Sequence, residues 1–310
     1  MKAPYLSLKD IHDAESVVKQ VAWRTPLLPF PPFESLFLKM ECLQRTGSFK
    51  IRGAWNRMTR ATREEIDRGF TATSAGNHGQ AVAWCARRLN AKCTVYVPDD
   101  AVKRKVDSIL SLGANVVKLS HAQIMDAMAY DTKWDMTYIH PFGDPYVIAG
   151  QGTVGLEILD ALPEVKSIIV PVGGGGLVNG IAIAVKSKDV KVYGVQAEGA
   201  APLPKSLMSG RAEDVGSPNT IADGIAATRV FDYMLPLFKK NLDDVFTVTD
   251  EEIKKSMSYL LHDCHVVSEP AGASSLAATI RYWDRLEKPA VAVISGGNCD
   301  PNLLLKIVNK

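Results

Sequence analysis

The sequence predicts an α/β protein with open, twisted, mostly parallel sheets that are covered by helices. Three observations support this fold class. Short β-rich runs alternate with helical patterns over nearly the whole chain. The β-α units have the length of crossover connections, which bring helices onto both faces of a parallel sheet. Four consecutive glycines at positions 173–176 stand between an apolar run that is typical of a buried strand and a helical pattern.

The N-terminal half supplies the first set of these units. Ser7 is the predicted N-cap of a helix whose Ile11 and Val18 lie roughly on one face. Strands and helices then alternate as far as a turn-rich cluster at residues 140–145, which is a predicted domain boundary. The predicted strands are residues 36–40, 70–73, 93–97, 115–119 and 136–139. The predicted helices are residues 50–58, 77–89, 102–112 and 122–130.

The C-terminal half continues the alternation. A predicted helix over residues 152–162 leads to a strand at 167–170, and a second helix follows the glycines as far as Lys188. Residues 199–219 are rich in proline, alanine and glycine, which predicts a long irregular connection with a functional or covering role. The other predicted strands are residues 190–196, 244–248 and 290–294. The other predicted helices are residues 250–262 and 271–286.

Composition places the chain among soluble globular enzymes. Its 310 residues are 46% hydrophobic and 23% charged. The net charge is only +2 and no basic run is long enough to follow a phosphate backbone, which argues against a nucleic-acid partner. Residues 1–10 lack the apolar core of a signal peptide, and no apolar run is long enough to span a bilayer. The five cysteines are scattered without a C-x-x-C pair, so we expect reduced thiols in a cytoplasmic protein without a membrane partner.

The segment from Thr46 to Ala54 is the most informative part of the chain. It places Lys50 between Phe49 and a small-residue turn, at the predicted start of a helix. A lysine amine confined in this way can form an imine with an aldehyde. Taken alone, the same pattern also fits a lysine on the solvated surface of a helix, so the other motifs have to decide between the two readings.

The second motif is the glycine run at residues 173–176, which Leu177 follows. Glycines at a strand-to-helix junction allow positive φ and let backbone N–H groups converge on an anion at the helix N-terminus. Ordering four glycines instead of alanines costs roughly 2–4 kcal/mol, a cost that a purely structural turn rarely requires. The spacing does not match G-x-x-x-x-G-K-[S/T], so we predict a phosphate site that does not serve nucleotide hydrolysis.

Two further motifs follow predicted strands. The segment from Ser74 to Gln80 contains Asn77, whose amide can donate to a ring oxygen, and His78, which can line the same cleft. A helix-start turn without a ligand is the alternative for this segment. Ser295 ends the last strand, at the sheet edge that also carries the glycine run. A hydroxyl facing a pyridine nitrogen leaves that nitrogen largely unprotonated, which favours β-elimination over transamination.

The four motifs, in this order and at these separations, resemble the fold-type-II pyridoxal phosphate (PLP) enzymes, the tryptophan synthase β-like group. Within that group they are similar to the threonine/serine dehydratase branch, over roughly residues 5–305. The resemblance implies a large PLP-binding domain from residues 1–52 and 143–310, and a small mobile domain inserted as residues 53–142. The cofactor is expected in the cleft between them. It also implies a homodimer or homotetramer.

The resemblance implies roles for individual residues. Lys50 is the expected catalytic residue, which forms the imine with PLP. Asn77 is expected to bond the cofactor's 3-hydroxyl, and Ser295 its pyridine nitrogen. The full set of implied cofactor contacts is Phe49, Lys50, Asn77, Gly173, Gly174, Gly175, Gly176, Leu177, Glu269 and Ser295. The loop implied to receive the substrate carboxylate contains Ser74, Ala75, Gly76 and His78.

The implied activity is β-elimination of water from a small amino acid, L-threonine or L-serine, which gives 2-oxobutanoate or pyruvate and ammonia. Ala75 stands where racemases of this branch carry a serine that acts as acid and base, and a methyl group cannot carry a proton. Glu198 matches a cation-binding glutamate of the racemases, but residues 199–204 offer no second carboxylate, so we expect no metal site. Ile51 stands where threonine synthases typically carry an aspartate.

These departures rank the alternatives. An amino-acid racemase, or a related β-lyase such as a hydroxyaspartate dehydratase, is the first rival within enzymes. A threonine synthase is less favoured because of Ile51 and His78. The rival from another class is a protein that keeps this fold and holds a phosphorylated ligand without turnover.

Overall fold

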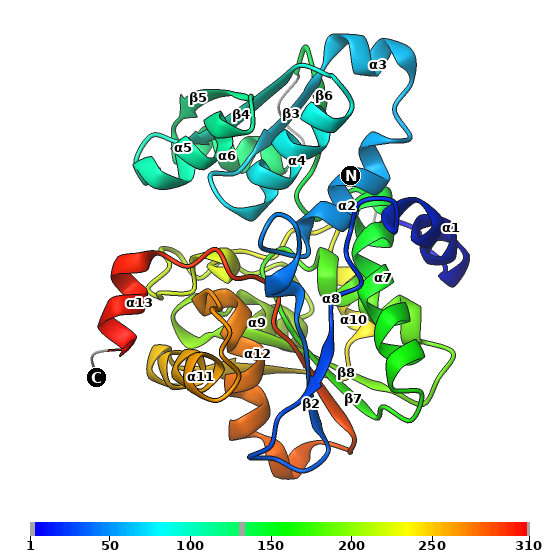
Figure 1. Ribbon diagram of the computed structural model, residues 1–310, viewed down its shortest axis with the longest axis vertical. Helices are drawn as coiled ribbons and strands as arrows, with labels where there is room; N and C mark the ends of the chain where they lie inside the picture. Colours follow the sequence, from blue (N-terminus) through cyan, green and yellow to red (C-terminus); the bar gives the residue numbers. More distant parts are fainter. Residues whose placement is uncertain (1–3, 130–133, 309–310) are drawn as a thin grey trace.

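The computed structural model describes residues 4–129 and 134–308, whose strands form a six-stranded and a four-stranded sheet (Figure 1). The larger sheet has the strand order β1 (Leu27–Pro29), β2 (Leu36–Lys39), β10 (Ala290–Val293), β7 (Ser167–Pro171), β8 (Lys191–Ala197) and β9 (Asp244–Val248). The smaller sheet has the order β5 (Asn115–Leu119), β4 (Cys93–Pro98), β3 (Phe70–Thr73) and β6 (Thr137–Tyr138). All pairings are parallel except β1 with β2, so the predicted fold class is confirmed.

Helices cover both faces of the larger sheet. Ile168 and Val170 of β7 belong to one hydrophobic core, and Ile169 between them belongs to another, as the two-residue repeat of a buried strand requires. The first core is completed by α1 (Leu8–Val18), α7 (Pro145–Ala161), α8 (Gly176–Val185), α9 (Pro202–Ser209) and α10 (Leu235–Asn241). The second is completed by α11 (Asp250–His262), α12 (Pro270–Arg281) and α13 (Pro301–Val308).

The smaller sheet has its own hydrophobic core, in which Phe70 of β3 and Val95 of β4 are buried. Figure 1 shows this sheet and its helices above the larger sheet, with α2 near the junction. Ile51 of α2 is buried in the core of the smaller sheet. The helices of this part are α2 (Lys50–Met58), α3 (Arg63–Arg68), α4 (Asn77–Arg88), α5 (Lys103–Ser111) and α6 (His121–Met128). Among all the described helices, none combines the length and the apolar character needed to cross a membrane.

Local signals explain why several elements begin where the sequence predicts. Ser7 and Asp10 form a capping box on α1, and Thr249 and Glu252 form one on α11. The strand at 244–248 and the helix at 250–262 have the predicted bounds. Four single turns of 3₁₀-helix complete the fold, at η1 (Glu41–Leu43), η2 (Glu198–Ala200), η3 (Asp223–Ile225) and η4 (Trp283–Arg285).

Two of the errors in the predicted elements concern prolines. The helix predicted to begin at residue 152 begins at Pro145, because Asp144 caps it by accepting hydrogen bonds from two backbone N–H groups. The region 199–219, predicted to be irregular, contains α9, whose first residue is Pro202. Proline favours the first position of a helix, where its missing N–H has no partner to lose. The helix predicted over residues 271–286 also ends early, at Arg281, and is followed by the 3₁₀ turn η4. Tyr130, the last residue of the helix predicted at 122–130, lies outside the described residues.

Candidate active site

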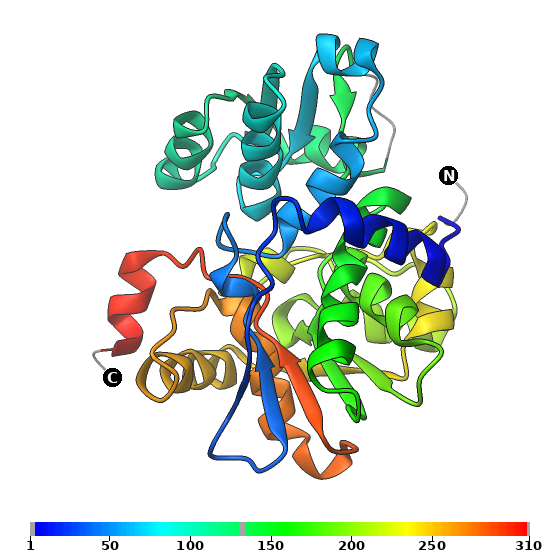
Figure 2. The ribbon, with the colours of Figure 1, turned by 45° about the vertical axis from the view of Figure 1, so that its right-hand side comes forward.

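Most of the predicted motifs directly follow strands of the two sheets; Figure 2 shows the smaller sheet and its helices above the larger sheet. β7 runs through the glycines at 173–176 into α8, and β10 ends two residues before Ser295. On the smaller sheet, β3 ends one residue before Ser74 and leads into α4. The backbone N–H of Phe49 donates to the Ser295 carbonyl at 3.2 Å, which ties the Lys50 segment to the end of β10. Two segments that are far apart in sequence, those of Lys50 and Ser295, therefore meet at this sheet edge.

Lys50 is the first residue of α2 and its side chain is partly buried. Its Nζ donates a hydrogen bond to the Pro141 carbonyl at 2.8 Å and lies 5.2 Å from the centre of the Phe49 ring. Burial lowers the pKa of the Lys50 amine to about 8, although the Glu269 carboxylate acts in the opposite direction. A substantial fraction of this amine is therefore neutral near pH 8, and only the neutral amine can attack an aldehyde or accept a proton.

The glycine run forms a narrow loop with free N–H donors. Gly175 has φ +93°, and a Cβ there would lie 2.2 Å from the Phe238 ring. A Cβ at Gly174 would lie 2.1 Å from Cδ1 of Phe142. The backbone N–H groups of residues 173–177 donate no hydrogen bond to any residue that the structure describes. Unpaired N–H groups at the N-terminus of α8 are the donors that a phosphate group needs, because they point at the ligand and the helix dipole favours negative charge.

Asn77, the first residue of α4, is held by two polar side chains. Its Nδ2 donates to Glu269 Oε1 at 2.6 Å, and its Oδ1 accepts from Asn298 Nδ2 at 2.6 Å. Burial, followed by the charge of Asp223, raises the pKa of Glu269 to about 7. Sequence reasoning named Asn77 and Glu269 but missed Asn298, whose Nδ2 also donates to the Thr46 carbonyl at 2.9 Å. Asn298 fixes which way the Asn77 amide points, so it links the Lys50 segment to the start of α4.

The loop predicted to receive the substrate carboxylate divides into two parts. Ser74, Ala75 and Gly76 are partly exposed, and Ser74 Oγ accepts from the Gly76 N–H at 3.1 Å. His78, in contrast, is buried, and its Nε2 lies 2.7 Å from the Ile139 carbonyl. Burial, with a smaller effect of the nearby Lys50 charge, lowers the pKa of His78 to about 3. The imidazole is therefore neutral and donates to Ile139 through Nε2.

Ser295 and Leu177 occupy buried positions at this sheet edge. The Ser295 hydroxyl forms no hydrogen bond with another described residue, although its backbone carbonyl is paired with Phe49. The side chain of Leu177 packs in the core on the α8 side of the larger sheet. Ser295 thus keeps a free hydroxyl at the end of β10, while the contribution of Leu177 to a ligand is confined to its backbone N–H.

A buried network of charged side chains surrounds Arg52, two residues after Lys50 on α2, and no sequence motif indicates it. Arg52 is fully buried and donates to Glu41 at 2.7 and 2.8 Å and to Glu157 at 2.7 and 2.9 Å. Lys39, also buried, donates to the same Glu157 at 2.5 Å. Two positive and two negative side chains balance one another here. The network joins the end of β2, the first turn of α2 and α7, so it fixes the helix that presents Lys50.

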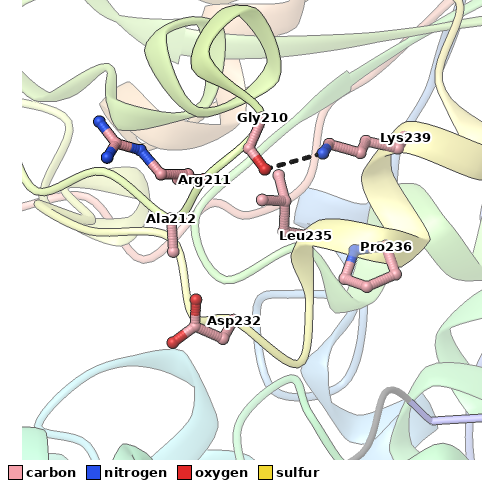
Figure 3. A pocket seen from close by; sticks show the side chains of 7 residues that line it. All are labelled: Gly210, Arg211, Ala212, Asp232, Leu235, Pro236 and Lys239. Carbon is pink, nitrogen blue, oxygen red and sulfur yellow. Dashed lines mark hydrogen bonds between the residues drawn. The ribbon is translucent and has the colours of Figure 1, made fainter.

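Other polar clusters lie apart from this region. Glu198 accepts a hydrogen bond from Arg281 Nη1 at 2.9 Å. Asp99, Asp100 and His121 form an exposed cluster, in which the two aspartates follow β4 and His121 begins α6. A surface pocket of about 490 Å³ lies between α10 and the segment that follows α9, where Lys239 Nζ donates to the Gly210 carbonyl at 2.9 Å (Figure 3). No predicted site residue lines this pocket; it is lined by Gly210, Arg211, Ala212, Asp232, Leu235, Pro236 and Lys239.

The residues at the strand ends fit PLP. A partly buried amine with a lowered pKa can react with the aldehyde, and the free N–H groups of residues 173–177 can bind the phosphate. The amide of Asn77 and the hydroxyl of Ser295 are available on neighbouring strand ends for the polar atoms of the ring.

Comparisons with known proteins agree with this fit. The profile of the family described as "Pyridoxal-phosphate dependent enzyme" matches residues 18–296. An L-threonine ammonia-lyase of Thermotoga maritima is 43% identical over 317 aligned residues, which cover 98% of this chain and 79% of the relative. A serine racemase of Dictyostelium discoideum is 37% identical over 321 aligned residues, 98% of each protein. The crystal structure of a threonine deaminase from T.th. has a TM-score of 0.87 at 35% identity, covering 95% of this chain and 99% of that one.

Proposed function

Because this chain belongs to the pyridoxal-phosphate-dependent enzymes of fold type II, we propose that it is a lyase that eliminates water from L-threonine or L-serine. The products are ammonia and 2-oxobutanoate or pyruvate. The observation that carries the proposal is the placement of the Lys50 amine, which donates to the carbonyl of Pro141, next in sequence to Phe142, whose ring packs against the glycine run. Relatives named L-threonine ammonia-lyase, which align over nearly the whole chain, support the same assignment.

In this proposal three groups of residues would hold the cofactor. The backbone N–H groups of residues 173–177 would bind its phosphate, the Asn77 amide would donate to its ring oxygen, and the Ser295 hydroxyl would bond its ring nitrogen. Glu269 keeps the Asn77 amide in place through the 2.6 Å hydrogen bond. Phe49 packs beside Lys50 at the start of α2. When bound, PLP withdraws electrons from the amino-acid Cα and so makes its proton acidic.

Lys50 acts as the base of the reaction. Its amine accepts the Cα proton, and the lowered pKa leaves it neutral often enough to do so near pH 8. The β-hydroxyl leaves as water after taking up a proton, which the protonated Lys50 amine can return. Water then hydrolyses the C=N bond of the released imine to ammonia and the 2-oxo acid. Ser74, Ala75, Gly76 and His78 belong to the loop that receives the substrate carboxylate, with backbone N–H groups near the N-terminus of α4 as the donors.

We further propose that residues 53–142 are a domain that closes over the substrate, against a larger domain of residues 1–52 and 143–310. Support comes from α5, which reaches from the smaller sheet to the larger domain. Lys105 forms an ion pair with Asp223, and Arg104 Nη2 donates to the Cys299 carbonyl at 2.6 Å. Closure of this kind excludes water and brings the substrate loop toward Lys50.

Racemisation of serine is the second candidate, since a serine racemase is 37% identical over nearly the whole chain. Racemisation needs an acid on the face of Cα opposite the lysine, whereas elimination does not. Ala75, on the partly exposed loop after β3, carries no proton to donate. The elimination is therefore the favoured reaction.

For the cellular setting we propose a cytoplasmic homodimer or homotetramer. The five cysteines are all free thiols, as is usual in a reducing compartment. Light scattering during size-exclusion chromatography measures the mass of the assembly, and a particle of the 33.7 kDa chain mass would contradict the oligomer.

The experiment that tests the function is release of 2-oxo acid from L-threonine, with L-serine and both D-enantiomers in parallel. We expect release from the L-enantiomers only. The Lys50→Ala variant should lose turnover and the visible absorbance of the lysine-bound cofactor. Lys9→Ala, which changes an exposed lysine, is the matched control and should keep both. A yellow protein that releases no oxo acid but interconverts L- and D-serine would replace the lyase by the racemase.

A further inference from the structure

The turn from His140 to Gly143 touches two parts of the candidate site. Its Pro141 carbonyl accepts the hydrogen bond of Lys50 Nζ at 2.8 Å. The ring of the next residue, Phe142, lies so close to the glycine run that a Cβ at Gly174 would be 2.1 Å from its Cδ1. A displacement of this turn would therefore move both the acceptor of the lysine amine and one wall of the phosphate loop.

The His140 imidazole holds this turn through hydrogen bonds to its backbone. Its Nδ1 accepts from the backbone N–H of Phe142 at 3.1 Å and of Gly143 at 2.7 Å. Its Nε2 lies 3.0 Å from the carbonyl of Met128, the last residue of α6. A carbonyl oxygen can only accept, so the proton is on Nε2 and Nδ1 is a bare acceptor. One ring thus pairs two backbone donors of the turn and anchors them to the smaller domain.

Packing holds the ring in that orientation. His140 is buried, and its ring meets the Phe142 ring edge-on with centroids 4.5 Å apart. Tyr233, from the larger domain, donates to the same Met128 carbonyl at 2.9 Å. A Cβ at Gly143 would lie 2.8 Å from the Tyr233 ring, so this position has to be glycine for the turn to approach so closely. Burial lowers the pKa of His140 to about 3, in agreement with a neutral ring.

We propose that neutral His140, protonated on Nε2, is a positioning residue that sets the Pro141 carbonyl against Lys50 and the Phe142 ring against the glycine run. The inference rests on the proposed function, because it takes Lys50 as the catalytic residue. His140 does not touch the reacting atoms. It acts through the turn. Its loss should therefore change the rate of the chemical step and the affinity for PLP more than the affinity for the substrate.

Two conservative variants separate this role from simple packing. In His140→Asn the amide oxygen takes the place of Nδ1, so the two N–H groups of the turn keep their acceptor. In His140→Gln the amide reaches the place of Nε2, so Met128 keeps a donor while the turn loses its acceptor. His121→Asn and His121→Gln change an exposed histidine and serve as controls.

The variants are purified as PLP-loaded enzymes, and kcat and KM for L-threonine, the PLP dissociation constant and the thermal midpoint are measured. For Gln we expect kcat to fall by about tenfold or more and PLP to bind more weakly, with KM changed less, since small misplacements of catalytic groups cost that much. For Asn we expect kcat within about threefold of wild type. Equal losses in both variants overturn the proposal. If the Gln variant does not fold, Asn decides: near-wild-type kcat supports the proposal, and an about tenfold loss at an unchanged thermal midpoint overturns it.

A failure of the proposed function gives a different result. In that case the wild type itself releases no 2-oxo acid from either L-substrate. The PLP dissociation constants of the Asn and Gln variants still test the positioning role, because they need no turnover.

Discussion

Replacing Arg52 by Met tests whether the buried charge network fixes the helix that presents Lys50. Arg52 is fully buried and contributes one of two positive charges to a neutral set of four. Without it, Glu41 and Glu157 share Lys39 as their only cationic partner in the set, which leaves one uncompensated negative charge. The variant also loses hydrogen bonds to the Thr153 hydroxyl and to the Trp23 carbonyl.

The magnitude follows from this inventory. Removing one partner of a buried ion pair typically costs about 3–5 kcal/mol, because the remaining charge stays buried without compensation. An unfolding entropy of roughly 2.1 cal/mol/K per residue gives about 0.65 kcal/mol/K for the 310 residues. The thermal midpoint of Arg52→Met should therefore fall by about 5–8 °C. Arg52→Lys keeps the charge but not the planar fork, so its loss should be smaller.

The assay is thermal unfolding followed by circular dichroism at pH 7 and pH 5. Although burial acts to raise it, the pKa of Glu41 is lowered from 4.5, chiefly by Arg52. In the Met variant burial acts without that opposition, so Glu41 takes up a proton at a higher pH than in wild type. The stability difference between the two proteins should therefore shrink from pH 7 to pH 5.

Arg63→Met is the matched control, since its side chain is 85% exposed and its pairing with Asp67 is on the surface. An Arg52→Met midpoint no lower than that of the Arg63 control would refute the reasoning. A drop that does not change with pH would show that lost packing, rather than the unpaired carboxylate, causes the effect.

Three further predictions concern the site itself. Gly174→Ala adds a methyl group against the Phe142 ring. Overpacking of this kind costs about 1–3 kcal/mol, so the PLP dissociation constant should rise about 5- to 150-fold. An unchanged dissociation constant in a PLP titration would contradict the close contact between Gly174 and Phe142. The pKa of Glu269 is raised from 4.5 to about 7, so the native state keeps this proton after the unfolded chain has lost it, and stability should decline between those two pH values. Glu269→Gln should flatten that decline in urea titrations, and an identical slope in both proteins would count against the assignment. Ala75→Ser supplies a hydroxyl on the substrate loop, and D-serine formation from L-serine should rise by about tenfold or more; chiral chromatography without such a rise would remove Ala75 as the determinant.

The fold could be predicted because its signals are local. The strand at 244–248 and helix α11 have the predicted bounds, since Thr249 and Glu252 mark the helix start in the sequence itself. The predicted start of α7 is wrong and α9 falls in a region predicted to be irregular, because proline has opposite effects at different positions of a helix. It breaks a helix in the interior and favours the first turn, and Pro145 and Pro202 are both at the start.

The residues of the candidate site also differ in whether a local sequence signal marks them. Lys50, Asn77 and the glycine run could be proposed as site residues because each lies in a short motif at the start of a helix. Asn298 and His140 could not, because their roles depend on partners that folding brings near. Asn298 meets Asn77 across 221 positions of sequence, and nothing in the residues around either one encodes that pairing.

The residues that position Lys50 and the residue on the opposite face of Cα have different effects on which reaction the chain favours. In the proposed mechanism both elimination and racemisation begin with transfer of the Cα proton to Lys50, so everything that positions this lysine serves both reactions equally. The Pro141 carbonyl, the His140 turn and the Arg52 network therefore carry no information about the product. The choice is made on the opposite face of Cα, where a proton must be delivered to invert the centre. The partly exposed loop after β3 offers a methyl group, Ala75, in place of a hydroxyl, so loss of the β-hydroxyl is the step that remains available.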